Sequence, residues 1–153
     1  MKELKVGDTI PRFTAKDAGG IDFDSTSIVG QKPLVIYFYP KDNTPGCTAE
    51  ACSFRDLYED FTDLGAEVIG ISSDSTASHQ KFAKQFKLPF ILLSDSDKKI
   101  RKLFGVPTGL FGLLPGRVTY VTDRNGVIQL IFDSVLATKH IPKALEAIKK
   151  LTR

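Results

Sequence analysis

Residues 34–39 constrain the fold of this chain more than any other segment. Their sequence, LVIYFY, is a continuous run of aliphatic and aromatic residues that ends at Pro40. Such a run is typical of a strand that is buried on both faces of a sheet, because a strand with one solvated face alternates polar and apolar residues. The segment therefore predicts a central strand whose sheet is covered by helices on both sides.

Further strands and helices alternate along the rest of the chain. We expect strands at residues 67–72 and 90–93, and helices around residues 82–86 and 100–104. This β-α-β rhythm is typical of a sheet with parallel central strands, because parallel neighbours need a crossover connection.

Two hairpins and a closing helix complete the expected fold. The Asn125-Gly126 pair joins two strand-like runs and predicts an antiparallel hairpin. Residues 17–20 are expected to turn a second hairpin near the N-terminus, and residues 141–151 place apolar side chains on one helical face. We therefore predict an α/β, thioredoxin-like fold, with a mixed central sheet flanked by helices and an N-terminal β-hairpin extension.

Length and composition indicate a single domain, residues 1–153. The chain contains no repeat and no linker-like stretch, and 42% hydrophobic with 25% charged residues is an ordinary globular composition. Its net charge is only +3, from 21 basic and 18 acidic residues that are evenly mixed, so nucleic acid is not an expected partner. The apolar runs are far shorter than the roughly 20 residues that span a bilayer, so we expect no membrane partner either.

The N-terminal residues also bear on localisation. Residues 1–11 contain no apolar stretch of the length that a signal peptide requires, and the chain has only two cysteines, too few for a secreted disulfide scaffold. We therefore expect a cytoplasmic protein. A processed chloroplast protein is the alternative, because it would show the same features.

Cys47 is expected in the first turn of a helix. Thr44 followed by Pro45 has the form of a helix N-cap and a first helical residue, and Gly65 is suited to end the helix. Cys47 is then the third helical residue. At that position the free backbone N–H groups and the positive end of the helix dipole favour a thiolate.

Cys52 lies five residues later and points in another direction. In a helix it is rotated by about 140° from Cys47 and displaced by about 7.5 Å along the axis, so Cys47 faces inward and Cys52 lies on the polar face. The two Cα atoms are then about 8 to 9 Å apart, beyond the roughly 7 Å at which a disulfide can close. A bond between these cysteines would require the helix start to unwind.

From these residues alone, two unrelated helix cysteines remain an open alternative. The pair lacks the Cys-x-x-Cys spacing of a thioredoxin-type dithiol. No metal site is expected, because the only histidines, His79 and His140, stand far apart from each other and from the cysteines in the sequence. We interpret both histidines as ordinary surface residues.

A longer motif around Cys47 resembles a known family. Residues 40–47, PKDNTPGC, match the peroxiredoxin signature of a proline, a threonine four residues later and a cysteine three residues after that. Residues 47–52, CTAEAC, add the second cysteine typical of the peroxiredoxin Q group, also called bacterioferritin comigratory proteins. The similarity extends over nearly the whole chain, and residues 109–117 look most like the cyanobacterial and plant members.

The resemblance implies a thiol peroxidase that acts in antioxidant defence. Cys47 would be the peroxidatic cysteine, which reduces hydrogen peroxide or an organic hydroperoxide and becomes a sulfenic acid. Cys52 would be the resolving cysteine, which forms an intramolecular disulfide that a thioredoxin-type partner then reduces. The resemblance implies no cofactor and no metal, and it suggests a monomer, since resolution within one chain needs no partner subunit.

Three further residues match the family motif. Arg117 matches the arginine that stabilises the thiolate and the charge that develops on the peroxide oxygen. Thr44 matches the threonine whose hydroxyl hydrogen-bonds the thiolate or the peroxide, and Pro40 matches the proline that shields the thiolate from water. Apolar residues at 110–114 could line the substrate entrance or only anchor their loop.

Two other kinds of function remain as alternatives. A thioredoxin-like interaction module could sense redox state through the same disulfide without turning over peroxide. A structural protein could carry two thiols that have no chemical role. Turnover of peroxide distinguishes the enzyme from both.

Overall fold

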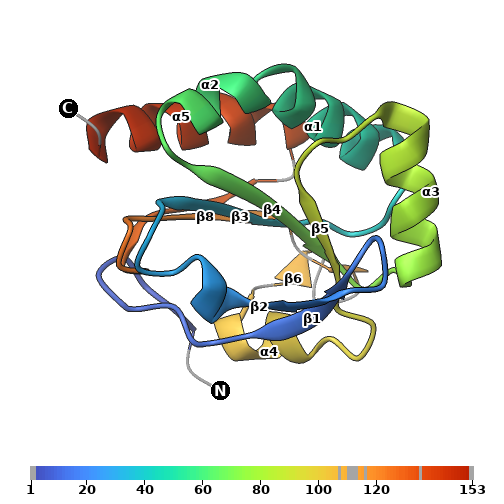
Figure 1. The fold of residues 1–153 in the computed structure, drawn as a ribbon, viewed down its shortest axis with the longest axis horizontal. Helices are drawn as coiled ribbons and strands as arrows, with labels where there is room; N and C mark the ends of the chain where they lie inside the picture. Colours follow the sequence, from blue (N-terminus) through green and yellow to red (C-terminus); the bar gives the residue numbers. More distant parts are fainter. Residues whose placement is uncertain (1–2, 107, 110–113, 116, 135, 152–153) are drawn as a thin grey trace.

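A mixed sheet forms the centre of the structure (Figure 1). The computed structural model describes residues 3–106, 108–109, 114–115, 117–134 and 136–151. Within these residues seven strands make up the sheet, in the order β2 (Asp22–Asp24), β1 (Thr14–Asp17), β5 (Ile91–Ser94), β4 (Glu67–Ser72), β3 (Leu34–Phe38), β8 (Val118–Thr122) and β9 (Ile128–Asp133).

The predicted central strand is confirmed. All five residues of β3 are buried, and β3 pairs in parallel with β4 and antiparallel with β8. β4 pairs in parallel with β5, and β8 pairs antiparallel with β9 across the expected Asn125-Gly126 turn, where Gly126 has φ +83°. A positive φ of this kind is accessible to glycine at little cost. The predicted thioredoxin-like class of fold therefore holds.

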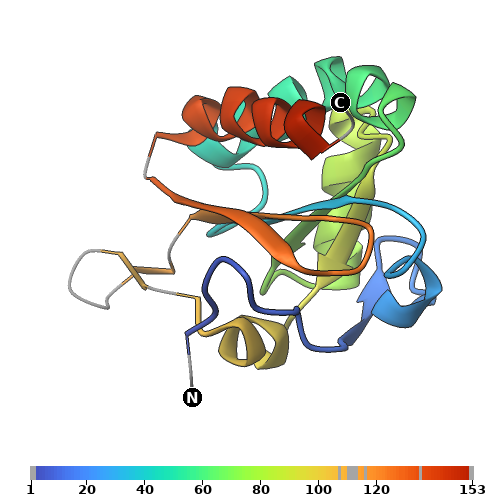
Figure 2. The same ribbon diagram turned by 90° about the vertical axis from the view of Figure 1, so that its left-hand side faces the viewer.

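The N-terminal hairpin is also present, and it is part of the main sheet. β1 pairs with β2 and also antiparallel with β5, so the hairpin extends one edge of the sheet. A small second hairpin, β6 (Thr108–Gly109) with β7 (Leu114–Pro115), was not predicted from the sequence. It lies outside the main sheet, shortly before Arg117 (Figure 2).

Helices cover both faces of the sheet (Figure 1). The helices α1 (Pro45–Asp56), α2 (Tyr58–Asp63), α3 (Thr76–Phe86) and α5 (His140–Leu151) contribute to the core on one side, and α4 (Lys99–Phe104) packs on the other. A short 3-10 helix at Ser25–Ser27 follows β2, and another at Ala137–Lys139 precedes α5. None of the helices in the described ranges is long and apolar enough to cross a membrane.

The helix expected between Pro45 and Gly65 is divided at Leu57. Leu57 has φ −107° and ψ 8°, which ends α1 and begins α2. Glu59 and Asp60 lie in the first turn of α2, where acidic side chains favour a helix N-terminus. The spacing of apolar residues continues across Leu57, so it predicted one continuous helix. Such spacing carries no information on a local change in backbone angles.

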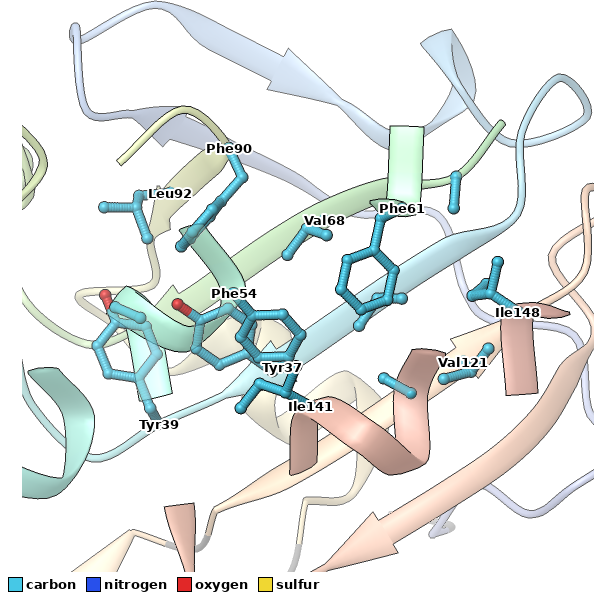
Figure 3. Close-up of a cluster of buried hydrophobic side chains, with 14 of the residues drawn as sticks. Tyr37, Tyr39, Phe54, Phe61, Val68, Phe90, Leu92, Val121, Ile141 and Ile148 are labelled. Atoms are coloured by element: carbon cyan, nitrogen blue, oxygen red, sulfur yellow. The ribbon is translucent and has the colours of Figure 1, made fainter. Parts of the chain in front are cut away.

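The core beneath α1 is rich in aromatic rings. Tyr37 and Phe54 stack with their ring centroids 4.6 Å apart, and Tyr37 and Tyr39 stack at 5.3 Å (Figure 3). Cys47 belongs to this cluster and is 1% exposed. The inward orientation that the helical wheel predicts for Cys47 is confirmed.

The interpretation of the two histidines as surface residues was wrong. His79 on α3 and His140 at the start of α5 are both completely buried. His79 contacts Asp42 and the Leu93 carbonyl, whereas Nδ1 of His140 is hydrogen-bonded with the Thr119 hydroxyl at 2.8 Å. Their partners lie far away in the sequence, so hydropathy alone could not reveal that these polar rings are satisfied inside the protein.

Candidate active site

Cys47 lies at the start of α1, which follows the carboxyl end of β3 after the connection formed by residues 39–44. Thr44 is the N-cap residue, with an extended backbone, and Pro45 is the first helical residue, as predicted. The first helical hydrogen bond runs from the amide of Thr48 to the carbonyl of Thr44 at 2.8 Å. The N–H groups of Gly46 and Cys47 therefore have no partner within the helix, and like the positive end of the dipole they lie at its N-terminal end.

Arg117 reaches Cys47 from the other side of the site. Its Nη2 donates to the Sγ atom of Cys47 at 3.3 Å. The two residues are 70 positions apart in the sequence, and they meet because Arg117 precedes β8, whose Val118 pairs with Phe38 at the end of β3. Burial on its own would lower the pKa of Arg117, but its interactions with Glu50 and Cys47 outweigh burial and raise the pKa. The guanidinium is thus a permanent cation beside the thiol.

Glu50 is a third member of the site that sequence reasoning missed. Its Oε1 accepts a hydrogen bond from Nη1 of Arg117 at 2.5 Å, and the side chain is completely buried. Its Oε2 has no hydrogen-bond partner within the described residues, and Nδ1 of His140 lies 3.8 Å away. Glu50 comes three residues after Cys47, so helical periodicity, which places both on one face, could have identified it.

The protonation state of Glu50 determines whether Arg117 is neutralised by Glu50 or keeps its positive charge available to Cys47. Burial raises the pKa of Glu50 to about 8, although Arg117 acts in the opposite direction. Near neutral pH the carboxyl group is therefore largely protonated. A neutral Glu50 still accepts a hydrogen bond from Arg117 and leaves the positive charge of the guanidinium available to a thiolate at Cys47.

Gly46 provides the space through which Arg117 approaches. A Cβ atom at this position would lie 3.2 Å from Nη2 of Arg117, so the guanidinium would have to shift by a few tenths of an ångström. The glycine before Cys47 thus permits the contact between the arginine and the thiol.

For the other two predicted site residues, Thr44 and Pro40, the described residues show no hydrogen bond to the Cys47 sulfur. Thr44 donates its hydroxyl hydrogen to the Lys41 carbonyl at 3.0 Å, within the loop that leads to α1. Pro40 is half-buried directly after the core residue Tyr39. Both belong to the segment between β3 and α1, and their chemical roles remain expectations.

Cys52 is on the same unbroken helix as Cys47, and both thiols are free. Cys52 is half-buried, whereas Cys47 is buried. Because α1 is helical from Pro45 to Asp56, the Cα atoms of the two cysteines are about 8 to 9 Å apart by helix geometry, too far for a disulfide. The resting fold therefore keeps the two thiols separate.

The expected substrate entrance at residues 110–114 lies largely outside the described residues. Only the backbone of Leu114, in β7, is part of the described chain. The prediction for this segment therefore remains an expectation.

The chain is similar over most of its length to proteins of known family. The sequence profile of the AhpC/TSA family matches residues 6–131. The protein named "Peroxiredoxin Q, chloroplastic" from Sedum lineare is 54% identical over 146 residues, which are 95% of this chain and 78% of that protein.

Solved structures agree with this assignment. Peroxidoxin BcpB from Mycobacterium tuberculosis superposes with a TM-score of 0.89 and 35% identity, covering 97% of this chain and 99% of that one. A cysteine-to-serine mutant of PrxQ from Xylella fastidiosa has a TM-score of 0.91 and 28% identity, with both chains fully covered.

Proposed function

Because this chain belongs to the AhpC/TSA family and is a thiol peroxidase of the peroxiredoxin Q group, we propose that Cys47 is the residue that attacks the hydroperoxide. The observation that carries this assignment is the contact between Nη2 of Arg117 and the Cys47 sulfur at a helix N-terminus. A cation and free backbone N–H groups both favour the thiolate, which is the nucleophilic form of cysteine.

In the proposed first step, the Cys47 thiolate attacks the terminal oxygen of the hydroperoxide. A sulfur–oxygen bond forms as the oxygen–oxygen bond breaks, which gives a sulfenic acid and an alkoxide or hydroxide that takes up a proton. Arg117 stabilises the negative charge as it passes from sulfur to the leaving oxygen. The roles proposed for Thr44 and Pro40 are to hydrogen-bond the peroxide and to limit access of water to the thiolate.

In the proposed second step, the Cys52 thiolate attacks the sulfenic sulfur of Cys47. A disulfide forms and the oxygen leaves as water after it takes up a proton. Since the two Cα atoms are too far apart in the intact helix, the start of α1 has to unwind for this step. The first turn is the part of a helix that its own hydrogen bonds hold least.

The proposal extends to the partners of the chain. Peroxiredoxins act on peroxides with thioredoxin-type reductants, and we propose a reductant of this type for the Cys47–Cys52 disulfide. We further propose that residues 1–153 act as one domain and as a monomer, without nucleic acid or membrane. The chloroplastic name of the Sedum lineare relative favours the processed chloroplast protein over the cytoplasm as the compartment.

A coupled assay tests the proposed cycle. Consumption of NADPH is followed in the presence of thioredoxin, thioredoxin reductase and hydrogen peroxide, and sustained turnover is expected. A redox-sensing module would form the disulfide once without turnover, and a structural protein would do neither. Failure of the intact protein to turn over peroxide would contradict the proposed function.

Variants of the two cysteines separate their roles. Cys52→Ser should still reduce one equivalent of peroxide through Cys47 but should not cycle with thioredoxin, whereas Cys47→Ser should lose both reactions. Mass spectrometry of the peroxide-treated protein should find a bond between Cys47 and Cys52. Unchanged cycling in Cys52→Ser would show that another group resolves the sulfenic acid.

A further inference from the structure

A buried polar cluster joins the loop before α1 to α3 and β5. Oδ2 of Asp42 lies 2.6 Å from Nδ1 of His79, and these side chains are 3% and 0% exposed. The same carboxylate accepts hydrogen bonds from the Tyr39 hydroxyl at 2.6 Å and from the Ser78 hydroxyl at 2.9 Å. Nε2 of His79 lies 2.9 Å from the carbonyl oxygen of Leu93.

Hydrogen-bond accounting assigns opposite charges to Asp42 and His79. The Leu93 carbonyl can only accept, so Nε2 of His79 must donate to it. The Tyr39 and Ser78 hydroxyl groups both donate to the Asp42 carboxyl group, as they do to an ionised carboxylate. An ionised carboxylate can only accept, so in its 2.6 Å contact with Nδ1 the ring is the donor. A ring that donates from both nitrogens is an imidazolium, and the contact is a buried ion pair.

The cluster is not arranged for a metal ion. Ligand atoms of Asp42, Asp74 and His79 lie within 4.8 Å of one another. However, the 2.6 Å between the Asp42 carboxylate and the His79 ring is a direct hydrogen bond that leaves no room for an ion between them. The Asp74 carboxylate is in turn occupied by the Ser72 hydroxyl at 2.6 Å.

The ion pair holds the loop that presents Cys47. Asp42 lies five residues before Cys47, in the connection between β3 and α1, and its backbone N–H donates to the Asp74 carboxylate at 2.8 Å. Asn43 follows with φ +62°, a left-handed conformation that costs energy for a non-glycine residue and needs support from its surroundings. Asp42 thus joins the loop to α3 and, through His79, to β5, next to a strained residue.

We propose that Asp42 and His79 are positioning residues for the peroxidase reaction: they hold the loop before α1 so that Cys47 meets Arg117 and the helix N-terminus together. The inference rests on the proposed role of Cys47. Catalytic groups lose efficiency steeply when they are displaced by about 1 Å. Neither Asp42 nor His79 touches the reacting sulfur, so they act through the loop.

The test compares His79→Gln with a matched control, Asp95→Asn. Gln at position 79 can replace one ring hydrogen bond but not the charge. Asp95 is also a buried carboxylate, 3% exposed, and accepts from the backbone amides of Ile100 and Arg101 at the start of α4, on the opposite face of the sheet. Loss of this cap should reduce stability without moving the loop at Cys47.

The measured quantities are the rate constant for oxidation of Cys47 by hydrogen peroxide, its pH profile, and the denaturant midpoint. We expect His79→Gln to lower the rate constant at least about tenfold and to move the acid limb of the profile to higher pH. Asp95→Asn should lower the midpoint but leave the rate and the profile within about twofold of the wild type. A fold defect alone would not move the pH profile of the folded molecules.

Equal rates and profiles in His79→Gln and the wild type would overturn the positioning role while leaving the proposed function intact. A wild type without peroxidase activity would instead contradict the proposed function itself. If His79→Gln does not fold, Ser78→Ala and Tyr39→Phe decide, since each removes one hydrogen bond to Asp42. A rate decrease of about two- to fivefold in either one supports the proposal, and wild-type rates in both overturn it.

Discussion

The buried carboxyl group of Glu50 makes a quantitative prediction for stability. Its pKa is raised by burial from 4.5 to about 8 in the folded protein, and on unfolding the group returns to its ordinary value. Between these two values the folded state keeps a proton that the unfolded state has released. Stability therefore falls as pH rises through this window, and Glu50 adds no further pH dependence below 4.5 or above about 8.

The variant Glu50→Gln should remove this dependence, because its amide does not titrate and can still accept a hydrogen bond from Arg117. Between about pH 5 and pH 8 the free energy of unfolding of the glutamate protein should fall, relative to that of the variant, by roughly 3 to 4 kcal/mol. Urea denaturation at a series of pH values measures this difference. Both proteins carry Cys47→Ser, so that no titration of Cys47 contributes.

The same substitution at an exposed glutamate is the matched control. The side chain of Glu146 on α5 is 62% exposed, and its pairing with Lys150 is worth little in water. Glu146→Gln should therefore follow the stability profile of its parent within about 0.5 kcal/mol. If the unfolding free energies of Glu50→Gln and its parent also differ by a constant amount across this range, burial does not hold a proton on Glu50. The inference that a neutral Glu50 leaves the charge of Arg117 available to Cys47 would then be wrong.

Three further substitutions near the site have distinct expected outcomes. The Tyr39 hydroxyl donates to Asp42, whereas the Tyr37 hydroxyl has no partner in the described chain. Tyr39→Phe should therefore lower the unfolding free energy by about 1 to 3 kcal/mol, and Tyr37→Phe should leave it almost unchanged. Gly46→Ala should lower the peroxidase rate about two- to tenfold without lowering the thermal midpoint, because the new Cβ displaces Arg117. Arg117→Lys retains the positive charge but not the two guanidinium nitrogens that contact Glu50 and Cys47. Rapid kinetics should show that the rate constant of Cys47 oxidation by peroxide falls about 10²-fold.

Local signals explain why the start of the site could be predicted from the sequence. Thr44 and Pro45 occupy the N-cap and first helical positions of α1, as the preferences of these two adjacent residues predict, although the Thr44 hydroxyl donates to the Lys41 carbonyl and does not cap the helix. The apolar run before Pro40 specifies β3 in the same way, through residues that are neighbours in the chain. Such features need no knowledge of the tertiary structure, and the structure confirms them.

Contacts between distant segments could not be predicted in this way. Glu50 is buried because Arg117, 67 positions away, satisfies it, and His79 is buried because Asp42, 37 positions away, does the same. Hydropathy assigns such residues to the surface, since an isolated charge is costly to bury. For Arg117 itself, only the family resemblance distinguished the residue from a solvated strand terminus.

The position of Glu50 between the two cysteines leads to a last prediction. Closing a disulfide between Cys47 and Cys52 requires the turn that contains Glu50 to unwind, which removes the carboxyl group from its buried contact with Arg117. In water its pKa would return toward 4.5, the value of an unperturbed glutamate.

The oxidised protein should therefore lack the pH-dependent stability difference between glutamate and glutamine at position 50. Urea denaturation of both proteins with the Cys47–Cys52 disulfide intact, where neither thiol titrates, measures this difference. A profile that is flat to within about 1 kcal/mol is expected, because Glu50 is then solvated in the folded and unfolded states alike. If the oxidised pair instead retains a difference of roughly 3 to 4 kcal/mol across the same range, Glu50 stays buried, and the disulfide closes without unwinding this turn.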